Sequence, residues 1–436
     1  MSGDFASDAA ALSLACASAA AALAQLPAKP DRDPAQAQAA ARLLAGSREP
    51  RERFLTDHAV ALYHALTAGM TRHVRIEQLM EDAPALVPGL VPSATQVAGE
   101  SAHRQADKDG LEIDQGLLLA HVLADPACGR HLCHAMLLPR PQARALLPVL
   151  ERDGAVDLPT ARVERRGRAT LLMTRNPRFL NAEDEATLED FETAVDLATL
   201  DPATDAVVLR GEVVEHPRHA GRRVFSAGIN LTHLYHGRIS YLWYLRRDLA
   251  AVNKIFRGVA VPDSPPDEWR GTTREKPWIA AVDAFAIGGG CQILLACDYV
   301  LAAHGAYMTL PARKEGIIPG AANLRLPRFV GDRIARQLIG YGRRLECDSP
   351  EGRLICDEIA APEDMDAAIE RVVDGLTNSG AVSLVGNRRA LRAGAEPLDT
   401  FRSYMAVYAR EQAICHFSPQ LIANLERYWQ AADRRA

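Results

Sequence analysis

Two glycine-bearing stretches constrain the fold of this chain more than any other feature. They are Phe225-Ser-Ala-Gly-Ile-Asn230 and Ala286-Ile-Gly-Gly-Gly-Cys-Gln292, and each adjoins an apolar run that predicts a strand. Glycine lets the backbone approach a ligand closely, so a nearby N–H group becomes an available donor. Two such N–H groups converging on one oxygen atom would stabilise negative charge there. The stretches therefore predict a fold that brings distant segments to one anion-binding point.

The segments around these glycines alternate between strand and helix patterns. Such a β-α-β rhythm predicts an α/β core, and right-handed crossovers would bring both glycine stretches to the same end of the sheets. Strands are predicted at residues 169–174, 206–210, 278–282 and 299–302, and helices at residues 183–200 and 289–297.

The chain outside this core has a helical pattern. Residues 1 to about 155 are rich in Ala and Leu, with prolines between segments and almost no β-branched alternation. The charged, turn-rich residues 151–159 predict a boundary, and helical spacing returns from residue 362 onward. We therefore predict an all-α N-terminal domain (1–158), an α/β core (159–375) and a helical C-terminal region (376–436).

The composition is that of an ordinary globular protein. The net charge of −5 over 436 residues gives no general reason to expect nucleic acid as a partner. The eight cysteines are scattered and no secretory signal accompanies them, so we expect free thiols and a cytoplasmic location. The Ala-rich residues 9–26 lack a basic start and predict a helix rather than an export signal, and no strongly apolar run is long enough to span a bilayer.

Four motifs occur in a fixed order. Asn176-Pro-Arg-Phe-Leu-Asn181 comes first, the two glycine stretches follow, and Gly316-Ile-Ile-Pro-Gly320 is last. Their order and spacing over residues 160–375 resemble the enoyl-CoA hydratase/isomerase (crotonase) superfamily. The resemblance implies a spiral of stacked ββα units, an acyl-CoA thioester substrate and an oxyanion hole formed by the N–H groups of Ile229 and Gly289. It also implies a trimer, or a hexamer of two trimers, in which the C-terminal region contributes to assembly and covers the active site.

The departures from that superfamily are as informative as the match. Hydratases place one catalytic glutamate three residues after the second oxyanion glycine and another just before the Gly-x-x-Pro-Gly turn, where this chain has Gln292 and Ala312. A glutamine amide is not a base at neutral pH, so hydration of a double bond loses both catalysts. Glu315 is displaced by three residues from the second position, and of a solvated and a catalytic role we expect the solvated helix or loop role.

The helical N-terminal extension, Gln292, Ala312 and the segment Ser240-Tyr-Leu-Trp-Tyr-Leu-Arg-Arg247 resemble one branch of the superfamily, the cofactor-independent arylacetyl-CoA dioxygenases of antibiotic biosynthesis. That resemblance implies conversion of 3,5-dihydroxyphenylacetyl-CoA and O2 to 3,5-dihydroxyphenylglyoxylate and CoA, with no metal and no organic cofactor. Two alternatives stay open. One is a thioester hydrolase of the same fold, and the other is a non-catalytic scaffold.

The resemblance also implies roles for individual residues. Glu183 and Arg247 would bind the ring hydroxyls, although Glu183 also suits the first turn of a helix and Arg247 lies in an Arg-Arg-Asp run. Gln292 would orient substrate, peroxide or water. Gly290 and Ile293 would complete the substrate site, and the apolar run around Ile293 would admit O2. Binding of the CoA moiety is expected from Arg178, Asn181, Arg222, Arg223, Ser226 and Ala227.

One cluster of potential metal ligands does not fit this interpretation. His121, Cys128, His131, Cys133 and His134 lie close together in the N-terminal region. Their spacing matches no familiar zinc site, so we expect packed helical side chains rather than a bound metal.

Overall fold

A computed structural model describes residues 2–261, 264 and 268–434 of the chain. The chain forms two compact units, each assembled from separate stretches of sequence. The helical unit contains Met1–Met136, Thr232–Leu242 and Arg402–Ala436, and the α/β unit contains Leu137–Leu231 and Trp243–Phe401. Each unit combines several separate stretches of the chain, whereas the predicted domains are continuous stretches, so the division at residues 158 and 375 stays a prediction.

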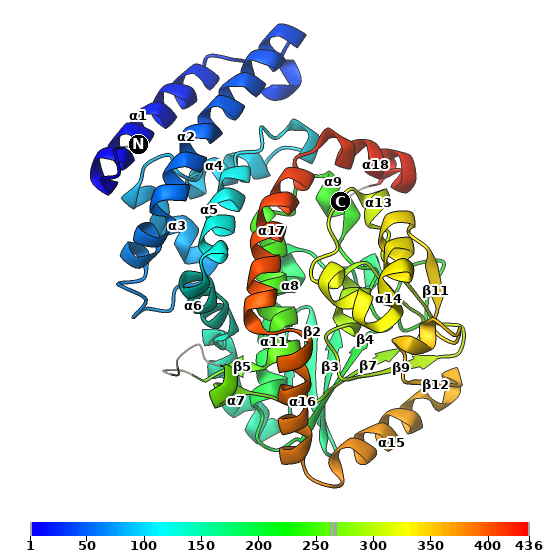
Figure 1. Ribbon diagram of the computed structural model, residues 1–436. Helices are drawn as coiled ribbons and strands as arrows, with labels where there is room; N and C mark the ends of the chain where they lie inside the picture. Colours follow the sequence, from blue (N-terminus) through cyan, green and yellow to red (C-terminus); the bar gives the residue numbers. More distant parts are fainter. Residues whose placement is uncertain (1, 262–263, 265–267, 435–436) are drawn as a thin grey trace. The chain divides into compact units, whose positions relative to one another are not determined.

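The helical unit is built from long and short α-helices (Figure 1). Several begin with side-chain caps: Asp33 and Ser93 each form a capping box with the glutamine three residues later. The helices are α1 (Phe5–Leu23), α2 (Pro34–Leu66), α3 (Ile76–Leu86), α4 (Ala94–Ser101), α5 (Ile113–Ala124), α6 (Pro126–Leu137), α9 (Leu231–Tyr235), α10 (Tyr241–Arg246), α17 (Leu398–His416) and α18 (Pro419–Trp429), of which α6, α9, α10 and α17 extend past the boundaries of the unit.

Helix α1 is long and apolar enough, by length and composition, to cross a membrane. It nevertheless carries a buried carboxylate, because Asp8 accepts a hydrogen bond from His58 Nε2 of α2 at 2.8 Å. The ring of Phe5 packs against Phe54 and His58 of the same partner helix. These contacts are those of a helix packed against α2, as in the core of a helical domain.

The α/β unit is organised around a seven-stranded sheet in the order β1-β2-β3-β4-β7-β9-β12. The five strands from β3 to β12 are parallel, whereas β1 and β2 are antiparallel additions at one edge. The strands are β1 (Ala155–Asp157), β2 (Ala161–Arg166), β3 (Ala169–Thr174), β4 (Ala206–Gly211), β7 (Trp278–Val282), β9 (Tyr299–Ala303) and β12 (Glu358–Ala360).

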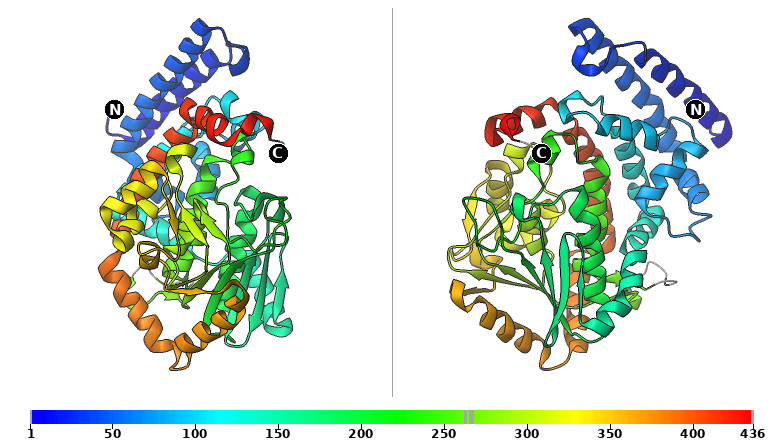
Figure 2. Two further views of the ribbon diagram at one scale, coloured as in Figure 1. Left: turned by 90° about the vertical axis from the view of Figure 1, so that its right-hand side faces the viewer. Right: turned by 180° about the vertical axis from the view of Figure 1, so that it is seen from behind.

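Helices cover both faces of this sheet (Figures 1 and 2). On one face of the sheet, alternate strand residues such as Leu171 and Val208 form a core with Val372 of α15 (Met365–Thr377). On the other face Leu209 lies against α8 (Glu185–Leu200), which packs on β2 and β3. Since successive side chains of a strand point to opposite faces, a sheet covered on both sides needs the continuous apolar runs that predicted these strands.

A three-stranded sheet in the order β11-β10-β8 completes the α/β unit. It contains β8 (Phe285–Ile287), β10 (Tyr307–Thr309) and β11 (Arg344–Glu346), and β5 (Val259–Ala260) pairs separately with β6 (Thr273–Arg274). The remaining helices of the unit are α7 (Pro141–Asp153), α11 (Val252–Arg257), α12 (Gly289–Leu294), α13 (Ala312–Glu315), α14 (Ala322–Tyr341) and α16 (Ala381–Ala395).

The predicted fold class is confirmed. The strands at 169–174 and 278–282 have the predicted bounds, and the helix predicted from residue 183 begins at Glu185, after Asp184 caps it. The N-terminal region is helical as predicted, and strands begin at Ala155, inside the predicted boundary segment.

Candidate active site

The two glycine stretches meet at the edge of the three-stranded sheet. Ser226 forms a parallel bridge with Ala286, and Ile287 N–H donates to the Ser226 carbonyl at 3.0 Å. A Cβ added to Gly228, whose φ is +80°, would lie 2.7 Å from the Ile287 carbonyl oxygen and 3.0 Å from the Gly289 nitrogen. Only glycine fits this approach, because a Cβ would clash and the backbone is in the left-handed region. The predicted convergence of the two stretches is confirmed.

Two backbone N–H groups remain without a backbone acceptor at this point. The backbone of Glu183 pairs with the residues on both sides of Ile229. Glu183 N–H donates to Gly228 O at 2.7 Å, and Asn230 N–H donates to Glu183 O at 2.8 Å. Gly289 is the first residue of α12, where the N–H has no partner within the helix. No carbonyl of the described chain accepts from Ile229 or Gly289. These neighbouring donors are therefore available to a ligand oxygen.

Arg247 is the centre of the polar network beside these donors. It contacts the Glu183 carboxylate through two nitrogens, with Nε–Oε2 at 2.5 Å and Nη2–Oε1 at 3.0 Å. It also donates to Asp248 Oδ1 at 2.9 Å, Gln292 Oε1 at 2.8 Å and the Gly289 carbonyl at 2.9 Å. The guanidinium side chain is 2% exposed, so these charge-assisted bonds replace its hydration. Arg247 thus connects Glu183, which follows the first motif, with Gly289 and Gln292 of the second glycine stretch.

A local irregularity in the helix positions Arg247 and Asp248. The regular turns of α10 end at Arg246, and residues Arg247–Ala251 form a π-helix before α11 begins. Such a bulge shifts the direction of side chains by one residue and recurs at functional sites. Asp248 was missed in the sequence, where the Arg-Arg-Asp run was the signal that could have indicated it.

Glycines allow the network to approach the backbone. A Cβ on Gly289 would lie 2.3 Å from Glu183 Oε1, so this carboxylate sits directly beside the Gly289 backbone. A Cβ on Gly320 would lie 2.6 Å from both Asp248 Oδ2 and Gln292 Oε1. The last glycine of the Gly316–Gly320 motif therefore lets that turn close against Asp248 and Gln292.

Gln292 is oriented by its partner. Its Oε1 accepts from Arg247, which has no acceptor atom, so the carbonyl end of the amide must face the guanidinium. The amide NH2 then points the other way as a donor. Gln292 cannot take up a proton here, but it can hydrogen-bond an oxygen atom.

The prediction that Glu315 is solvated is wrong. Glu315 ends α13, is 8% exposed, and lies beside the turn that presents the second donor: a Cβ on Gly288 would be 3.7 Å from Glu315 Oε1. Burial removes the solvation of its charged form and raises the carboxyl pKa from 4.5 to about 7. The helix packs against α14, which the local sequence did not indicate.

The residues expected to bind CoA lie in different environments. Arg178 is exposed beside the Phe179 ring, and Arg222 is exposed, whereas Arg223 pairs with Glu212 at 2.8 Å. The Asn181 amide donates to the Glu212 and Val224 carbonyls and accepts from Asn176 N–H, so it holds the backbone of the motif. Ser226 Oγ accepts from Gly228 N–H at 3.0 Å, and Ala227 N–H donates to Leu180 O at 3.1 Å.

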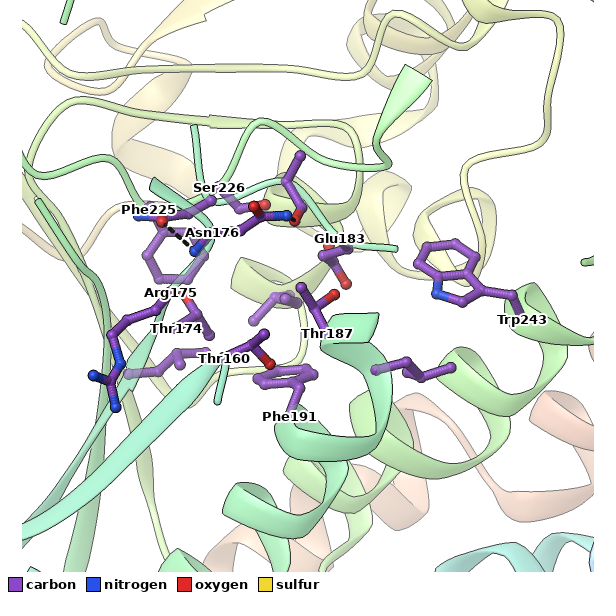
Figure 3. A pocket seen from close by; sticks show the side chains of 15 residues that line it. Thr160, Thr174, Arg175, Asn176, Glu183, Thr187, Phe191, Phe225, Ser226 and Trp243 are labelled. Carbon is purple, nitrogen blue, oxygen red and sulfur yellow. Dashed lines mark hydrogen bonds between the residues drawn. The ribbon is translucent and has the colours of Figure 1, made fainter. Parts of the chain in front are cut away.

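A narrow cavity borders Glu183 and Ser226 on the α8 side (Figure 3). Its free volume of about 30 Å³ admits a water-sized molecule but no aromatic ring. Phe191, Phe225 and Ile293 form much of its apolar wall. Gly290, by contrast, packs against Ser226, since an added Cβ would lie 2.9 Å from the Ser226 Cβ.

Four of the five potential metal ligands in the helical unit, Cys128, His131, Cys133 and His134, are buried. His131 Nδ1 hydrogen-bonds Tyr63 Oη at 2.8 Å and its ring stacks on His73. Burial, with a smaller contribution from His73, lowers the pKa of His131 to about 4. His121 contacts Glu52 at 3.0 Å. Within the described residues, no group of three or more His, Cys, Asp or Glu side chains has the geometry of a metal site.

Comparison with known proteins places this chain in a family. The sequence profile described as Enoyl-CoA hydratase/isomerase matches residues 266–410. An enoyl-CoA hydratase structure from Mycobacterium avium subsp. paratuberculosis K-10 superposes with a TM-score of 0.51 and 21% identity, covering 62% of this chain and 98% of that one, which supports the fold. Together with a relative that is 47% identical over 92% of this chain, the profile match shows that the chain belongs to the enoyl-CoA hydratase/isomerase family.

Within that family, the chain is similar along most of its length to a dioxygenase. It is 47% identical over 401 residues to the (3,5-dihydroxyphenyl)acetyl-CoA 1,2-dioxygenase of Amycolatopsis orientalis, covering 92% of this chain and 91% of the relative. The crotonyl-CoA hydratase of Syntrophomonas wolfei is 26% identical, with 53% of this chain and 81% of that protein covered. An alignment of 401 residues necessarily includes most of the helical N-terminal region.

Proposed function

We propose that this protein is a dioxygenase that converts 3,5-dihydroxyphenylacetyl-CoA and O2 to 3,5-dihydroxyphenylglyoxylate and CoA. The observation that carries the proposal is the 47% identity to the Amycolatopsis orientalis dioxygenase across 92% of this chain. The catalytic glutamates of hydratases are replaced here by Gln292 and Ala312, which argues against hydration.

The paired donors at Ile229 and Gly289 support an enolate intermediate. Loss of a proton from the α-carbon leaves a carbanion delocalised over the ring and the thioester, and the two N–H groups would hold its oxygen. The carbanion passes one electron to O2, and the two radicals combine to an α-peroxide. The peroxide attacks the thioester carbonyl and the C–S bond breaks, which releases CoA. Loss of the second α-proton then supplies the electron pair of the new C=O bond as the O–O bond breaks, and this gives the α-keto acid. Both oxygen atoms of O2 enter the acid.

The network around Arg247 supports recognition of two phenolic hydroxyls. Glu183 offers a carboxylate acceptor and Arg247 a buried cation, both within the reach of a ligand above Gly289. The Gln292 amide NH2 would donate to the substrate or to the peroxide. Gly290 would border the acyl group through its backbone, since Ser226 occupies the space beside its Cα, and Ile293 would form the apolar wall through which O2 enters.

The CoA moiety would follow the first two motifs. Arg178 and Arg222 present exposed guanidinium groups suited to phosphate oxygens. Arg223 would serve more weakly, since it is paired with Glu212. Asn181, Ser226 and Ala227 would shape the backbone against which the CoA lies.

The proposal includes no metal and no organic cofactor, because the ring and thioester make the α-carbanion able to reduce O2. It also includes assembly as a homotrimer or a hexamer of two trimers, with residues 376–436 contributing to the interface, and a cytoplasmic location. The three-part division of the chain at residues 158 and 375 belongs to the same proposal.

The test is O2 uptake and thiol release with 3,5-dihydroxyphenylacetyl-CoA, using protein of measured metal content. We expect one O2 consumed for each CoA released, both oxygen atoms of 18O2 in the acid, and rates independent of bound iron or copper. Turnover that scales with metal content would overturn the metal-free step. CoA release at the same rate without O2 would indicate a thioester hydrolase, and no reaction with any arylacetyl-CoA would indicate a scaffold.

A further inference from the structure

The proposed reaction needs a group that accepts the α-proton, and the candidate site contains three carboxylates, those of Glu183, Asp248 and Glu315. Glu183 and Asp248 are both bound by Arg247, at 2.5 Å and 2.9 Å. Protonation of either would break a charge-assisted bond to a guanidinium that is itself buried. These two carboxylates therefore suit binding and positioning better than proton transfer.

Glu315 differs from both in its contacts. Within the described chain no hydrogen bond or ion pair engages its carboxyl oxygens, and Glu315 is 8% exposed. Its neighbours on α13, Arg313 and Lys314, are exposed, and no charged side chain of another element contributes to the shift of its pKa. A carboxyl group without partners, buried beside a ligand-facing turn, can bind and release a proton without dismantling an ion pair.

Glu315 lies beside Gly288, the residue that immediately precedes one of the two oxyanion donors. A Cβ on Gly288 would lie 3.7 Å from Glu315 Oε1 and 3.8 Å from the Gly228 Cα, and these glycines immediately precede Gly289 and Ile229. Glu315 also lies three residues after Ala312, so one turn of α13 brings it to the same side of the helix. The turn thus carries a carboxyl group even though Ala312 has none.

We propose that Glu315 is the general base of this enzyme, the group that removes the α-proton of the arylacetyl thioester. Its carboxylate forms the new O–H bond, the α C–H bond breaks, and the electron pair moves into the enolate whose oxygen faces Ile229 and Gly289. No oxidant or co-reactant takes part in this step. This inference rests on the function proposed above.

Exchange of the α-hydrogens with solvent separates the proton-transfer step from the oxygen chemistry. The substrate is incubated with enzyme in D2O without O2, and deuterium at the α-carbon is followed by mass spectrometry. We expect Glu315→Gln to slow exchange by on the order of 10² to 10⁴, the range for a lost general base. Binding of 3,5-dihydroxybenzoyl-CoA, which has no α-hydrogen, should stay within about threefold of wild type for an isosteric change outside the binding contacts.

Two further measurements distinguish a catalytic role of Glu315 from a purely structural one. Glu315→Asp keeps the carboxyl group and should retain exchange at an intermediate rate. In the wild type, the exchange rate should rise about tenfold per pH unit below pH 7 and level above it, as expected for a base that must be ionised. The control variant is Glu346→Gln, which removes a carboxyl group from a surface ion pair with Arg344. It should change neither the rate of α-hydrogen exchange nor the pH dependence of that rate.

The outcomes are distinguishable. Exchange in Glu315→Gln within threefold of wild type, or a flat pH profile in the wild type, overturns the assignment of Glu315. If wild-type protein exchanges the α-hydrogen through Glu315 but consumes no O2, the dioxygenase proposal fails while the base assignment stands.

Discussion

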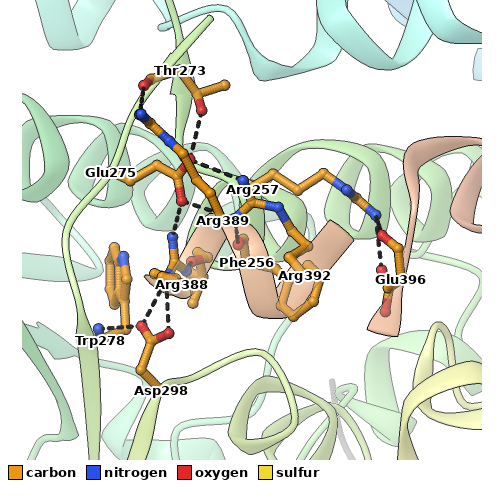
Figure 4. A network of polar contacts seen from close by, with 11 residues as sticks. Phe256, Arg257, Thr273, Glu275, Trp278, Asp298, Arg388, Arg389, Arg392 and Glu396 are labelled. Carbon is orange, nitrogen blue, oxygen red and sulfur yellow. Dashed lines mark hydrogen bonds and ion pairs between the residues drawn. The ribbon is translucent and has the colours of Figure 1, made fainter. Parts of the chain in front are cut away.

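Two buried charge clusters in the α/β unit have opposite construction. At the candidate site one cation, Arg247, is surrounded by two carboxylates, an amide oxygen and a backbone carbonyl. Near β7 one carboxylate, Glu275, is surrounded by Arg388, Arg389 and Arg392 (Figure 4). In sequence each cluster shows only a short run of charges, and the remaining partners of opposite charge lie far away in the chain.

The difference lies in what each cluster adjoins. The Glu275 cluster holds α16 against the segment that precedes β7. Arg388 of this cluster also forms an ion pair with Asp298, and the Asp298 carboxylate accepts a hydrogen bond from Trp278 N–H (Figure 4). Nearby, Glu396 is bound in the same manner by Arg257, Arg325 and Arg328. The Arg247 cluster instead adjoins glycine backbone and two available N–H donors. In a structural cluster the charged groups bind only one another and the protein, whereas a functional site also has hydrogen-bond donors that are available to a ligand.

The largest effect is expected from Arg247→Met. It leaves the Glu183 and Asp248 carboxylates without their cation, so we expect a loss of about 3–5 kcal/mol in unfolding free energy and of at least 10²-fold in O2 uptake. Denaturant unfolding and O2 electrode assays measure the two losses. Arg336→Met, which removes an exposed ion pair with Asp332 on α14, is the control and should stay within about 1 kcal/mol. Wild-type turnover in Arg247→Met would make this cluster structural as well.

Glu275→Gln tests the other cluster. Three arginines lose their shared carboxylate, so the unfolding free energy should fall by about 3–5 kcal/mol while turnover per folded molecule is unchanged. Chemical denaturation and initial rates at low temperature provide the comparison, with Glu346→Gln as the surface control. A specific loss of turnover would contradict the distinction between the clusters.

Acid should weaken the carboxylate-centred clusters. Burial alone would raise the pKa of Glu275 and Glu396, but the hydrogen bonds and charges of their arginines outweigh it and lower both to about 2. Because the unfolded chain then binds these protons first, their stabilisation is complete above the unfolded pKa of 4.5 and is lost as pH falls from 4.5 through 2. Each carboxylate contributes about 3 kcal/mol. Unfolding free energies measured from pH 6 to 3 should show this decline, and Glu275→Gln should make it shallower.

The smallest effect is expected from Gln292→Glu. The substitution adds a third carboxylate around Arg247 and removes the amide NH2 donor, so turnover should fall about 10- to 100-fold with little change in stability. Steady-state O2 uptake measures the loss. Gln337→Glu is the control, since Gln337 also accepts from an arginine, Arg343, but on the exposed surface of α14. Unaltered turnover would mean that the Gln292 NH2 does not contact the reacting atoms.

Local signals made part of the site predictable. Gly228 and Gly289 were recognisable in the sequence, because a side chain at either position would clash with the group that approaches its backbone. The strands around them were predictable for a related reason, since burial on both faces demands unbroken apolar runs. Glu183 and Arg247 were named through the family resemblance, and the sequence did not indicate that they bind each other.

Other features depended on packing that no local pattern records. Glu315 follows Arg313 and Lys314 in a polar segment, so its sequence suggests solvent exposure, yet its side chain is buried beside Gly288. Asp248 turns toward Arg247 because a π-helix interrupts the regular helical spacing.

The sequence by itself determined the α/β core, the glycine pair and the loss of the hydratase glutamates, because each is a property of residue identity at a fixed spacing. Only the tertiary structure decided which charges became a closed cluster and which became a site. The energy of a charge depends on its solvation and its partners, and both are set by residues far away in the chain. Glu275, with three arginines, and Glu315, with no charged partner in the described chain, are the two extremes.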